Sequence, residues 1–146
     1  PDDVTIQAMW DKRDYATHLV SNLCFYPALI ASWVPRVRAR GVELPLVLGI
    51  AGKVELAKLA RVATKIGVGE STRFLRKNTA TFTRMAKPGG YNPRKFLDKI
   101  GPVLDDQDMG VAGLHIYTFN QIKDTEVWRR KQLAALGGAE EVSTAW

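Results

Sequence analysis

The sequence has few residues that bind metals or form disulfides: one cysteine, Cys24, and two histidines, His18 and His115, among 146 residues. One cysteine excludes an internal disulfide and any multi-cysteine metal site, and two histidines are too few for a histidine-rich metal cluster. We therefore expect no metal site. A single cysteine also fits a reducing compartment, so we predict a cytoplasmic protein.

Long apolar runs and leader-like segments are missing as well. No apolar stretch approaches the roughly 18 residues of a membrane helix, and no charged-then-apolar segment opens the chain as a signal peptide would. We therefore expect no membrane partner. Neither G-x-G-x-x-G after a strand nor G-x-x-x-x-G-K-[ST] occurs, so the two standard phosphate fingerprints at helix N-termini are absent.

The composition is that of an ordinary globular domain, with 46% hydrophobic and 25% charged residues. The formal net charge of +6 favours anionic partners such as nucleic acid, phosphates or carboxylate-rich small molecules. The length predicts one domain, because domains usually run to about 100–200 residues.

Strand-like and helix-like patterns alternate along the chain. Short apolar runs bounded by Gly or Pro predict buried strands at 18–25, 44–50 and 111–119. Apolar residues at helical spacing predict helices at 4–15, 27–40, 53–66, 93–104 and 121–136. Residues 70–78 fit a short strand or a helical turn, and turn residues predict a loop at 79–92 and a turn at 105–110.

The helix predicted at 27–40 has clear end signals. Pro27 suits its first turn, Gly41 ends it, and Pro35 should kink it or break it into two pieces. Three basic residues complement the dipole at its C-terminal end: Arg36, Arg38 and Arg40. Asn92 is the expected N-cap of the helix at 93–104.

Strands that alternate with helices of crossover length predict βαβ units, hence an α/β fold with a parallel sheet. Because each predicted strand is apolar throughout, we expect both faces of the sheet to be covered. A (β/α)8 barrel needs about 250 residues, so this chain would supply about half of one. An isolated half-barrel exposes two unpaired edges, and a helical pattern begins almost at residue 1, so we expect further chain upstream.

Three segments, in order, resemble the methylenetetrahydrofolate reductase family. GLHIYTFN at 113–120 is similar to the family's last-strand motif, His-Phe-Tyr-Thr-Leu-Asn preceded by Gly or Asp. HLVSNLCFY at 18–26 is similar to a family strand that ends in Ile-Thr-Gln before aromatic residues. LPLVLGIAGKVELAKLARVATKIGVGESTRFLRK at 44–77 looks like the stretch in which a strand leads into Pro-Gly-Ile or Gly-Ile-Pro-Gly and then a helix.

The resemblance implies the C-terminal half of a TIM barrel over residues 1–136, followed by a tail at 137–146. It further implies an enzyme that binds FAD, takes electrons from NAD(P)H and reduces 5,10-methylenetetrahydrofolate to 5-methyltetrahydrofolate in one-carbon metabolism and methionine biosynthesis. Both substrates would use the C-terminal face of the strands. The family's general-acid glutamate lies on an early strand with no counterpart here, so the resemblance assigns this chain no catalytic residue. The missing N-terminal half of the barrel is then an expected partner, and a homo-oligomer is compatible with this fold.

Site residues follow from the resemblance position by position. On the substrate side it implies four residues: Asn22, Lys58, Tyr117 and Gln121. On the flavin side it implies three: Lys12 and Arg13, which approximate a basic helix near the cofactor's phosphates, and Ala16, which matches an alanine before the strand. Asn22 retains the carboxamide of the family's glutamine, and because we expect it inside a buried strand, it needs hydrogen-bond partners.

Several positions depart from the family and leave a second interpretation open. Asn22 stands for a longer glutamine, Val62 for an aromatic residue, and Gln121 for an arginine that can follow the last-strand motif. These departures motivate the alternative of a folate-binding or methyl-transfer protein on the same fold that lacks flavin reductase activity.

Basic residues gather between positions 73 and 99, where Asp98 is the only acid opposite eight lysines and arginines. They form either a solvated face or an anion site for cofactor phosphates or a folate's glutamate tail. A nucleic-acid-binding domain ranks below both other functions, because the segment's few aromatic residues follow no recognised nucleic-acid-binding pattern. We therefore expect no nucleic-acid partner.

Overall fold

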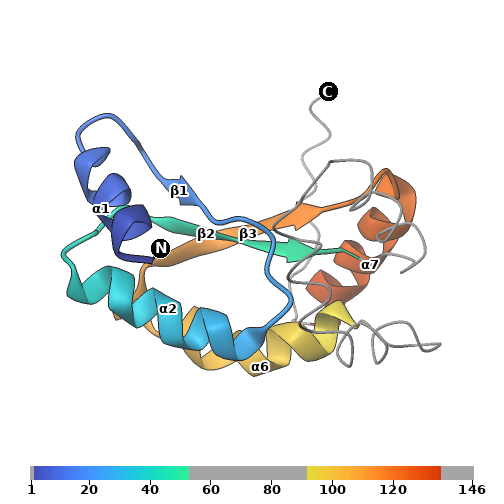
Figure 1. Cartoon of the computed structure of the whole chain (residues 1–146). Helices are drawn as coiled ribbons and strands as arrows, with labels where there is room; N and C mark the ends of the chain where they lie inside the picture. The colour runs from blue at the N-terminus through green and yellow to red at the C-terminus, as the bar shows by residue number, and fades with distance from the viewer. Residues whose placement is uncertain (1, 53–91, 136–146) are drawn as a thin grey trace, which may run out of the picture. The chain divides into compact units, whose positions relative to one another are not determined.

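A computed structural model describes residues 2–52 and 92–135 of the chain (Figure 1). Their elements, in order, are α1 (Asp2–Asp11), β1 (Leu19–Val20), α2 (Pro27–Ala39), β2 (Leu46–Ala51), α6 (Pro93–Asp105), the 3-10 helix η1 (Gln107–Met109), β3 (Val111–Tyr117) and α7 (Ile122–Ala135). The chain divides into two compact units. The first comprises Pro1–Ala51 and Pro93–Tyr117 and holds the sheet; the second comprises Gly52–Asn92 and Thr118–Trp146 and holds α7.

The first unit is built on a three-stranded parallel sheet whose spatial order, β1-β2-β3, equals the order in the chain. Helix α2 connects β1 to β2, and α6 precedes β3. Both helices lie on the same face of the sheet, where they pack against each other (Figure 1). Crossovers between parallel strands are normally right-handed. When neighbouring strands follow one another in sequence, two such crossovers place their helices on the same face of the sheet. The prediction of an α/β fold with parallel strands is therefore confirmed.

The core lies between this sheet and the two helices. Leu46, Leu48 and Ile50 of β2 are fully buried, and Leu48 lies beside Ile30 and Trp33 of α2. The buried residues of the helices are Ile30, Val34 and Val37 in α2 and Pro93, Phe96, Ile100 and Val103 in α6. The central strand is buried on both faces, because Gly49 and Ala51 are buried too.

The expectation that every strand is covered on both faces is wrong for the outer strands. In β1, Val20 is 49% exposed, and β3 is only partly buried along its length. The strand predicted at 18–25 is reduced to Leu19–Val20, because the chain bulges away from β2 directly afterwards. The strands predicted at 44–50 and 111–119 are confirmed as β2 and β3, within two residues.

The helices predicted around α2, α6 and α7 are confirmed as well. Helix α2 starts at Pro27 and ends before Gly41, whose φ of 78° is the left-handed conformation that favours glycine at a helix end. It continues through Pro35 as one helix, so the predicted break does not occur. Val34 and Val37 on either side of the proline are fully buried, so packing against the core stabilises both halves of the helix.

The sequence predicted only that Arg38 complements the dipole of α2. In the structure, Arg38 also bonds to backbone groups of two other segments. Its guanidinium donates hydrogen bonds to four backbone carbonyl oxygens: those of Val42, Leu44, Met109 and Gly110. The first two lie between α2 and β2, and the other two lie just before β3. Burial lowers the pKa of Arg38, yet an arginine remains charged in proteins. One side chain therefore ties together the segments that enter the two long strands.

Several predictions concern residues outside the described ranges: the helix at 53–66, the segments 70–78 and 79–92, and the tail at 137–146. Helix α1 begins at Asp2 and ends at Asp11, earlier at both ends than the predicted 4–15. Among the residues that the structure describes, no helix combines the length and apolar character needed to cross a bilayer.

Candidate functional site

The three parallel strands end at one edge of the sheet, and two of the predicted substrate residues lie there. Tyr117 is the last residue of β3, and Asn22 follows β1 by two residues. Ligand sites of parallel α/β sheets occur at this carboxyl edge. The structure thus places Asn22 and Tyr117 at the end of the sheet where a site is expected, on the two strands that flank β2.

A bulge shapes the chain where Asn22 lies. The ladder between β1 and β2 is regular up to the bond from the Ser21 N–H to the Val47 carbonyl (2.9 Å). Regular parallel pairing would continue with Leu23 donating to the Gly49 carbonyl, but Cys24 N–H donates to it instead, at 3.0 Å. One extra residue has therefore entered the β1 side of the ladder, which is the definition of a bulge.

Side chains satisfy both backbone groups that the bulge releases. The Gly49 N–H donates to Ser21 Oγ at 2.8 Å, so a hydroxyl replaces the missing carbonyl acceptor. The Leu23 N–H, displaced from Gly49, donates to Asn22 Oδ1 at 2.7 Å. The Ser21 hydroxyl in turn donates to the Asn22 carbonyl at 3.1 Å. Gly49 is buried, and a buried backbone group without a partner is costly, so the bond to Ser21 Oγ in particular stabilises the bulge.

Gly49 is the residue that leaves room for this bulge. A Cβ built on Gly49 would lie 2.5 Å from the Ser21 carbonyl oxygen and 2.7 Å from that of Asn22, closer than real contacts allow. The backbone of β1 therefore fills the space that a side chain would need. A glycine inside a strand often marks such a close backbone approach.

Asn22 itself is exposed, not buried in a strand as the sequence predicted. Its Oδ1 atom has a structural partner in Leu23 N–H, while its Nδ2 atom makes no hydrogen bond within the described part of the chain. The reason is the bulge, which ends β1 before Asn22 and turns this residue out of the ladder.

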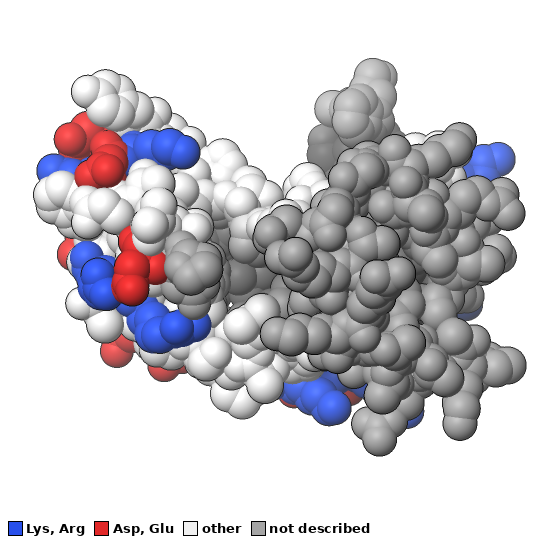
Figure 2. Space-filling view, in the orientation of Figure 1, with Lys and Arg blue, Asp and Glu red and all other residues white. Residues whose placement is uncertain are grey.

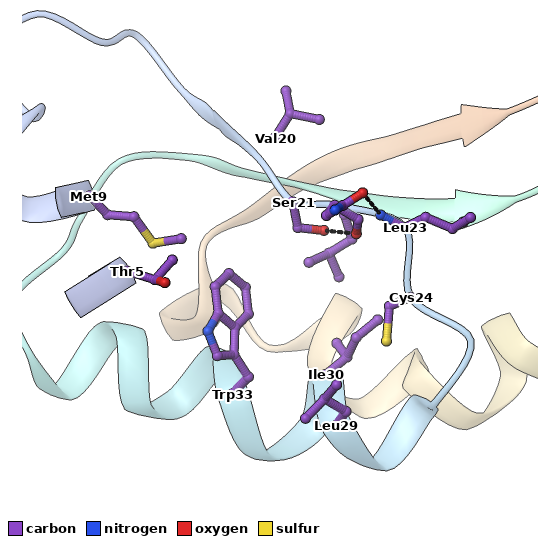
Figure 3. A pocket seen from close by; sticks show the side chains of 11 residues that line it. Thr5, Met9, Val20, Ser21, Leu23, Cys24, Leu29, Ile30 and Trp33 are labelled. Atoms are coloured by element: carbon purple, nitrogen blue, oxygen red, sulfur yellow. Dashed lines mark hydrogen bonds between the residues drawn. The ribbon is translucent and has the colours of Figure 1, made fainter. Parts of the chain in front are cut away.

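Asn22 lines a pocket of about 410 Å³ between β1 and the helices (Figure 3). Trp33 and Ile30 of α2 rise from below, and Thr5 and Met9 of α1 close one side (Figure 3). The remaining described lining residues are Val20, Ser21, Leu23, Cys24, Leu29 and Leu48. None of these side chains carries a formal charge at neutral pH, so the pocket suits a neutral, largely apolar group.

Cys24 contributes a protonated thiol to this pocket. Burial raises its pKa, and the hydrogen bond from the backbone of Tyr26 opposes the effect only in part. A thiol with a raised pKa is a poor nucleophile. A role as a small packing residue is consistent with this environment.

The face of the sheet opposite the helices carries Tyr117 and His115. Register pairs His115 with Gly49 and Tyr117 with Ala51, and the two rings meet edge to face at 4.7 Å between centroids. Tyr117 is half-buried and does not belong to the residues that line the pocket beside Asn22. Asn22 and Tyr117 therefore share an edge of the sheet without sharing that pocket.

The three residues assigned to the flavin lie at the other edge of the sheet. Lys12, Arg13 and Ala16 occupy the turn between α1 and β1, and hence precede the amino end of the strand. The Arg13 guanidinium stacks 3.6 Å above the centre of the Trp10 ring and donates to the Trp10 carbonyl. The structure thus does not bring these residues together with Asn22 and Tyr117.

The two other predicted substrate residues lie elsewhere. Lys58 falls outside the described residues. Gln121 is buried in the second compact unit, where its N–H donates to the Thr118 carbonyl at 2.8 Å. It follows Phe119 and Asn120, whose φ values of 50° and 63° are uncommon for residues other than glycine.

The described surface does not present a continuous basic patch on the face shown in Figure 2. Acidic and basic side chains alternate there over the part formed by α1 and α2, where Arg40 pairs with Asp3. Within the basic segment at 73–99, only the part from 92 onward is described, and there Arg94 pairs with Asp98 at 3.1 Å. No group of three metal-ligating side chains occurs among residues 2–52 and 92–135.

Sequence reasoning missed Ser21 and Gly49, which build the bulge. Gly49 carried a signal, because a lone glycine in an apolar strand indicates a bulge or a close backbone approach. Ser21 carried none, because its partner lies 28 residues further along the chain. A scan of protein-family models finds none that matches this chain.

Proposed function

We propose that the sheet is an arc of a (β/α)8 barrel and that the chain belongs to a flavin-dependent reductase resembling methylenetetrahydrofolate reductase. The supporting observation is the strand order. Three parallel strands follow one another in sequence with both helices on one face, as in a barrel wall. A doubly wound open sheet shares this arrangement within each of its halves but reverses its strand order at a switch point, which these three strands do not contain.

On this proposal, the carboxyl edge is the substrate side of the barrel. Asn22 follows β1 and Tyr117 ends β3, the two strands that flank β2 in the wall. The Asn22 amide offers a hydrogen-bond donor, and Tyr117 offers a phenol beside the imidazole of His115. Tyr117 and His115, on the face away from the helices, would contact the substrate inside the barrel, and Asn22 would contact it only at the rim. The remaining strands and the proton donor would come from the missing N-terminal half of the barrel.

FAD, reduced by NAD(P)H, would supply the hydride in such an enzyme. The residues of this chain assigned to it do not fit that role, because Lys12, Arg13 and Ala16 precede the strands and Arg13 is engaged by Trp10. On this proposal, any flavin contacts therefore belong to other parts of the protein.

The same placement favours the second candidate, a one-carbon protein that holds a folate or transfers its methyl group without flavin. It needs only the proposed substrate edge, where Asn22 and Tyr117 lie, and no flavin contacts from this chain. The two candidates differ in their use of NAD(P)H.

The test is to purify the chain, alone and with any upstream segment of its gene, and to record visible absorbance and 5-methyltetrahydrofolate binding by calorimetry. Bound flavin that NAD(P)H bleaches supports the reductase. Folate binding in colourless protein supports the second candidate. Absence of both flavin and folate binding in the longest protein contradicts both.

A further inference from the structure

Another pocket, of about 320 Å³, lies between α1 and the C-terminal end of α2. Its described lining residues are Ile6, Gln7, Trp10 and Arg40. The two helices are packed together there, because Ile6 belongs to one buried cluster with Val37 and Val42, and Figure 1 shows α1 beside this end of α2. Neither Asn22 nor Tyr117 is among the described lining residues. This α1–α2 pocket is therefore separate from the edge of the sheet to which the proposed function assigns the substrate.

The side chain of Arg40 extends beside α1 at this pocket. Near its backbone, Gly41 lies against Trp10, since a Cβ built on Gly41 would lie 3.7 Å from the indole nitrogen Nε1. At the other end of the side chain, the guanidinium donates to the Asp3 carboxylate. Trp10 and Asp3 are separated by roughly two turns of α1, or about 10 Å at 1.5 Å per residue. Arg40 thus spans about two turns of α1, and its pairing with Asp3 holds it in this position.

The pair between Arg40 and Asp3 is easily exchanged for another partner. The two side chains are 57% and 79% exposed, and exposed ion pairs contribute little to stability. The guanidinium also has donors to spare, because Nε and Nη1 make no hydrogen bond within the described part of the chain. A carboxylate can accept two parallel bonds from an arginine. A ligand carboxylate can therefore replace Asp3 at small cost.

The lining of the pocket combines an apolar ring with hydrogen-bond donors. Trp10 is 39% exposed, and its Nε1–H has no hydrogen-bond partner among residues 2–52 and 92–135. Arg13 stacks on the indole at 3.6 Å and does not line the pocket, so the pocket reaches the ring elsewhere. No carboxylate is among the described lining residues, and Asp11 is engaged by the Gln7 amide at 2.9 Å. These groups suit a ligand that has an aromatic ring and an anionic group.

We propose that the α1–α2 pocket binds a small aromatic carboxylate, with its ring against Trp10 and its carboxylate on the Arg40 guanidinium in place of Asp3. Asp3 then competes with the ligand for Arg40. Pockets that bind small molecules begin at about 300 Å³, so the volume suits a ligand of one or two rings. The site is independent of the proposed function, because it shares no residue with the substrate edge.

The experiment compares three probes that carry the same ring, on the full chain. They are the anion 2-naphthoate, the neutral 2-naphthamide and the cation 2-naphthylmethylammonium. Binding is followed by protein NMR through the indole N–H signal of Trp10, which the variant Trp10→Phe identifies among the four tryptophans. We expect 2-naphthoate to bind most tightly of the three and to shift this signal.

Two substitutions should change 2-naphthoate binding in opposite directions. Asp3→Asn removes the competitor and should tighten binding roughly two- to fivefold, as expected for an exposed ion pair. Arg40→Gln removes the charged donor and should weaken binding roughly tenfold. Arg36→Gln is the matched control, because Arg36 is exposed on the same helix, does not line the pocket and should leave binding unchanged. Since all three residues are exposed, each melting temperature should stay within about 4 °C of the wild type.

Three results would overturn the inference. The first is that the wild type does not bind 2-naphthoate, or binds the amide or the cation as tightly. The second is that Asp3→Asn binds 2-naphthoate no better than the wild type, which would show that Asp3 does not compete for Arg40. The third is that Arg36→Gln weakens binding as much as Arg40→Gln, which would reduce the effect to general attraction by a basic protein.

Discussion

Replacing Gly49 by alanine tests the close contact between β2 and the bulge. The new Cβ would lie 2.5 Å from the Ser21 carbonyl oxygen, and ordinary contact begins at 3.4 Å. One strand must therefore retreat by roughly 0.9 Å, an overpacking strain that typically costs about 1–3 kcal/mol. The obstacle is backbone, so a change of rotamer gives no relief.

The same retreat stretches the two hydrogen bonds of Gly49, to Ser21 Oγ and from Cys24 N–H. Each of these bonds contributes about 0.5–1.5 kcal/mol to stability. Alanine also restricts the unfolded chain more than glycine does, which stabilises the folded state by about 0.5–1 kcal/mol. We therefore expect Gly49→Ala to lower the free energy of unfolding by about 1–5 kcal/mol. The free energy of unfolding of a whole domain is only about 5–15 kcal/mol, so this loss is large.

Urea unfolding followed by circular dichroism and tryptophan fluorescence measures the effect. Gly113→Ala is the matched control, because Gly113 lies in the neighbouring strand and nothing lies within 4 Å of its added Cβ. The control should change stability by less than about 1 kcal/mol. Equal stability of the two variants would refute the geometry described for the bulge.

Four further predictions address other parts of the chain. Gly101→Ala in α6 should raise stability by about 0.5–1 kcal/mol in thermal unfolding, because its Cβ meets nothing within 4 Å. Arg38→Lys should destabilise by about 2–4 kcal/mol in urea unfolding, because an ammonium cannot reach four carbonyls as the planar fork does. Two arginines lower the pKa of Glu126 from 4.5 to about 2, so the stability it contributes is complete above pH 4.5 and is lost as the pH falls toward 2. An NMR titration should show this pKa, and Glu126→Gln should flatten that part of the stability curve. The raised pKa of Cys24 predicts slower labelling by a thiol reagent at pH 7 than for free cysteine.

The elements that sequence predicted well carry their signals within one segment. Helix α2 has a proline at its start and a glycine just beyond its end, and β2 is an uninterrupted apolar run. Hydrophobic period and end signals are local properties, so a single sequence reveals them.

The parts that sequence did not predict depend on distant partners. β1 stops early because Ser21 bonds to Gly49, 28 residues away, and Arg38 meets Met109 across 71 residues. No local pattern contains such pairs. Lys12, Arg13 and Ala16 were assigned to the flavin by sequence similarity alone. Sequence similarity does not show that these residues, which precede β1, lie at the opposite edge of the sheet from Asn22, which follows it.

Arg38 has a consequence for how the sheet is aligned. A parallel strand that slips by one residue turns every side chain to the opposite face, and in β3 such a slip would exchange His115 and Tyr117 for Leu114 and Ile116. Arg38, on α2, donates hydrogen bonds to the Met109 and Gly110 carbonyls just before β3, and so holds the start of β3 at a fixed position beside the helix. Arg38 thus fixes where β3 enters the sheet, and the register shift that follows, where the ladder passes from Val111 to Gly113 and skips Ala112, decides which rings the far side of the sheet presents.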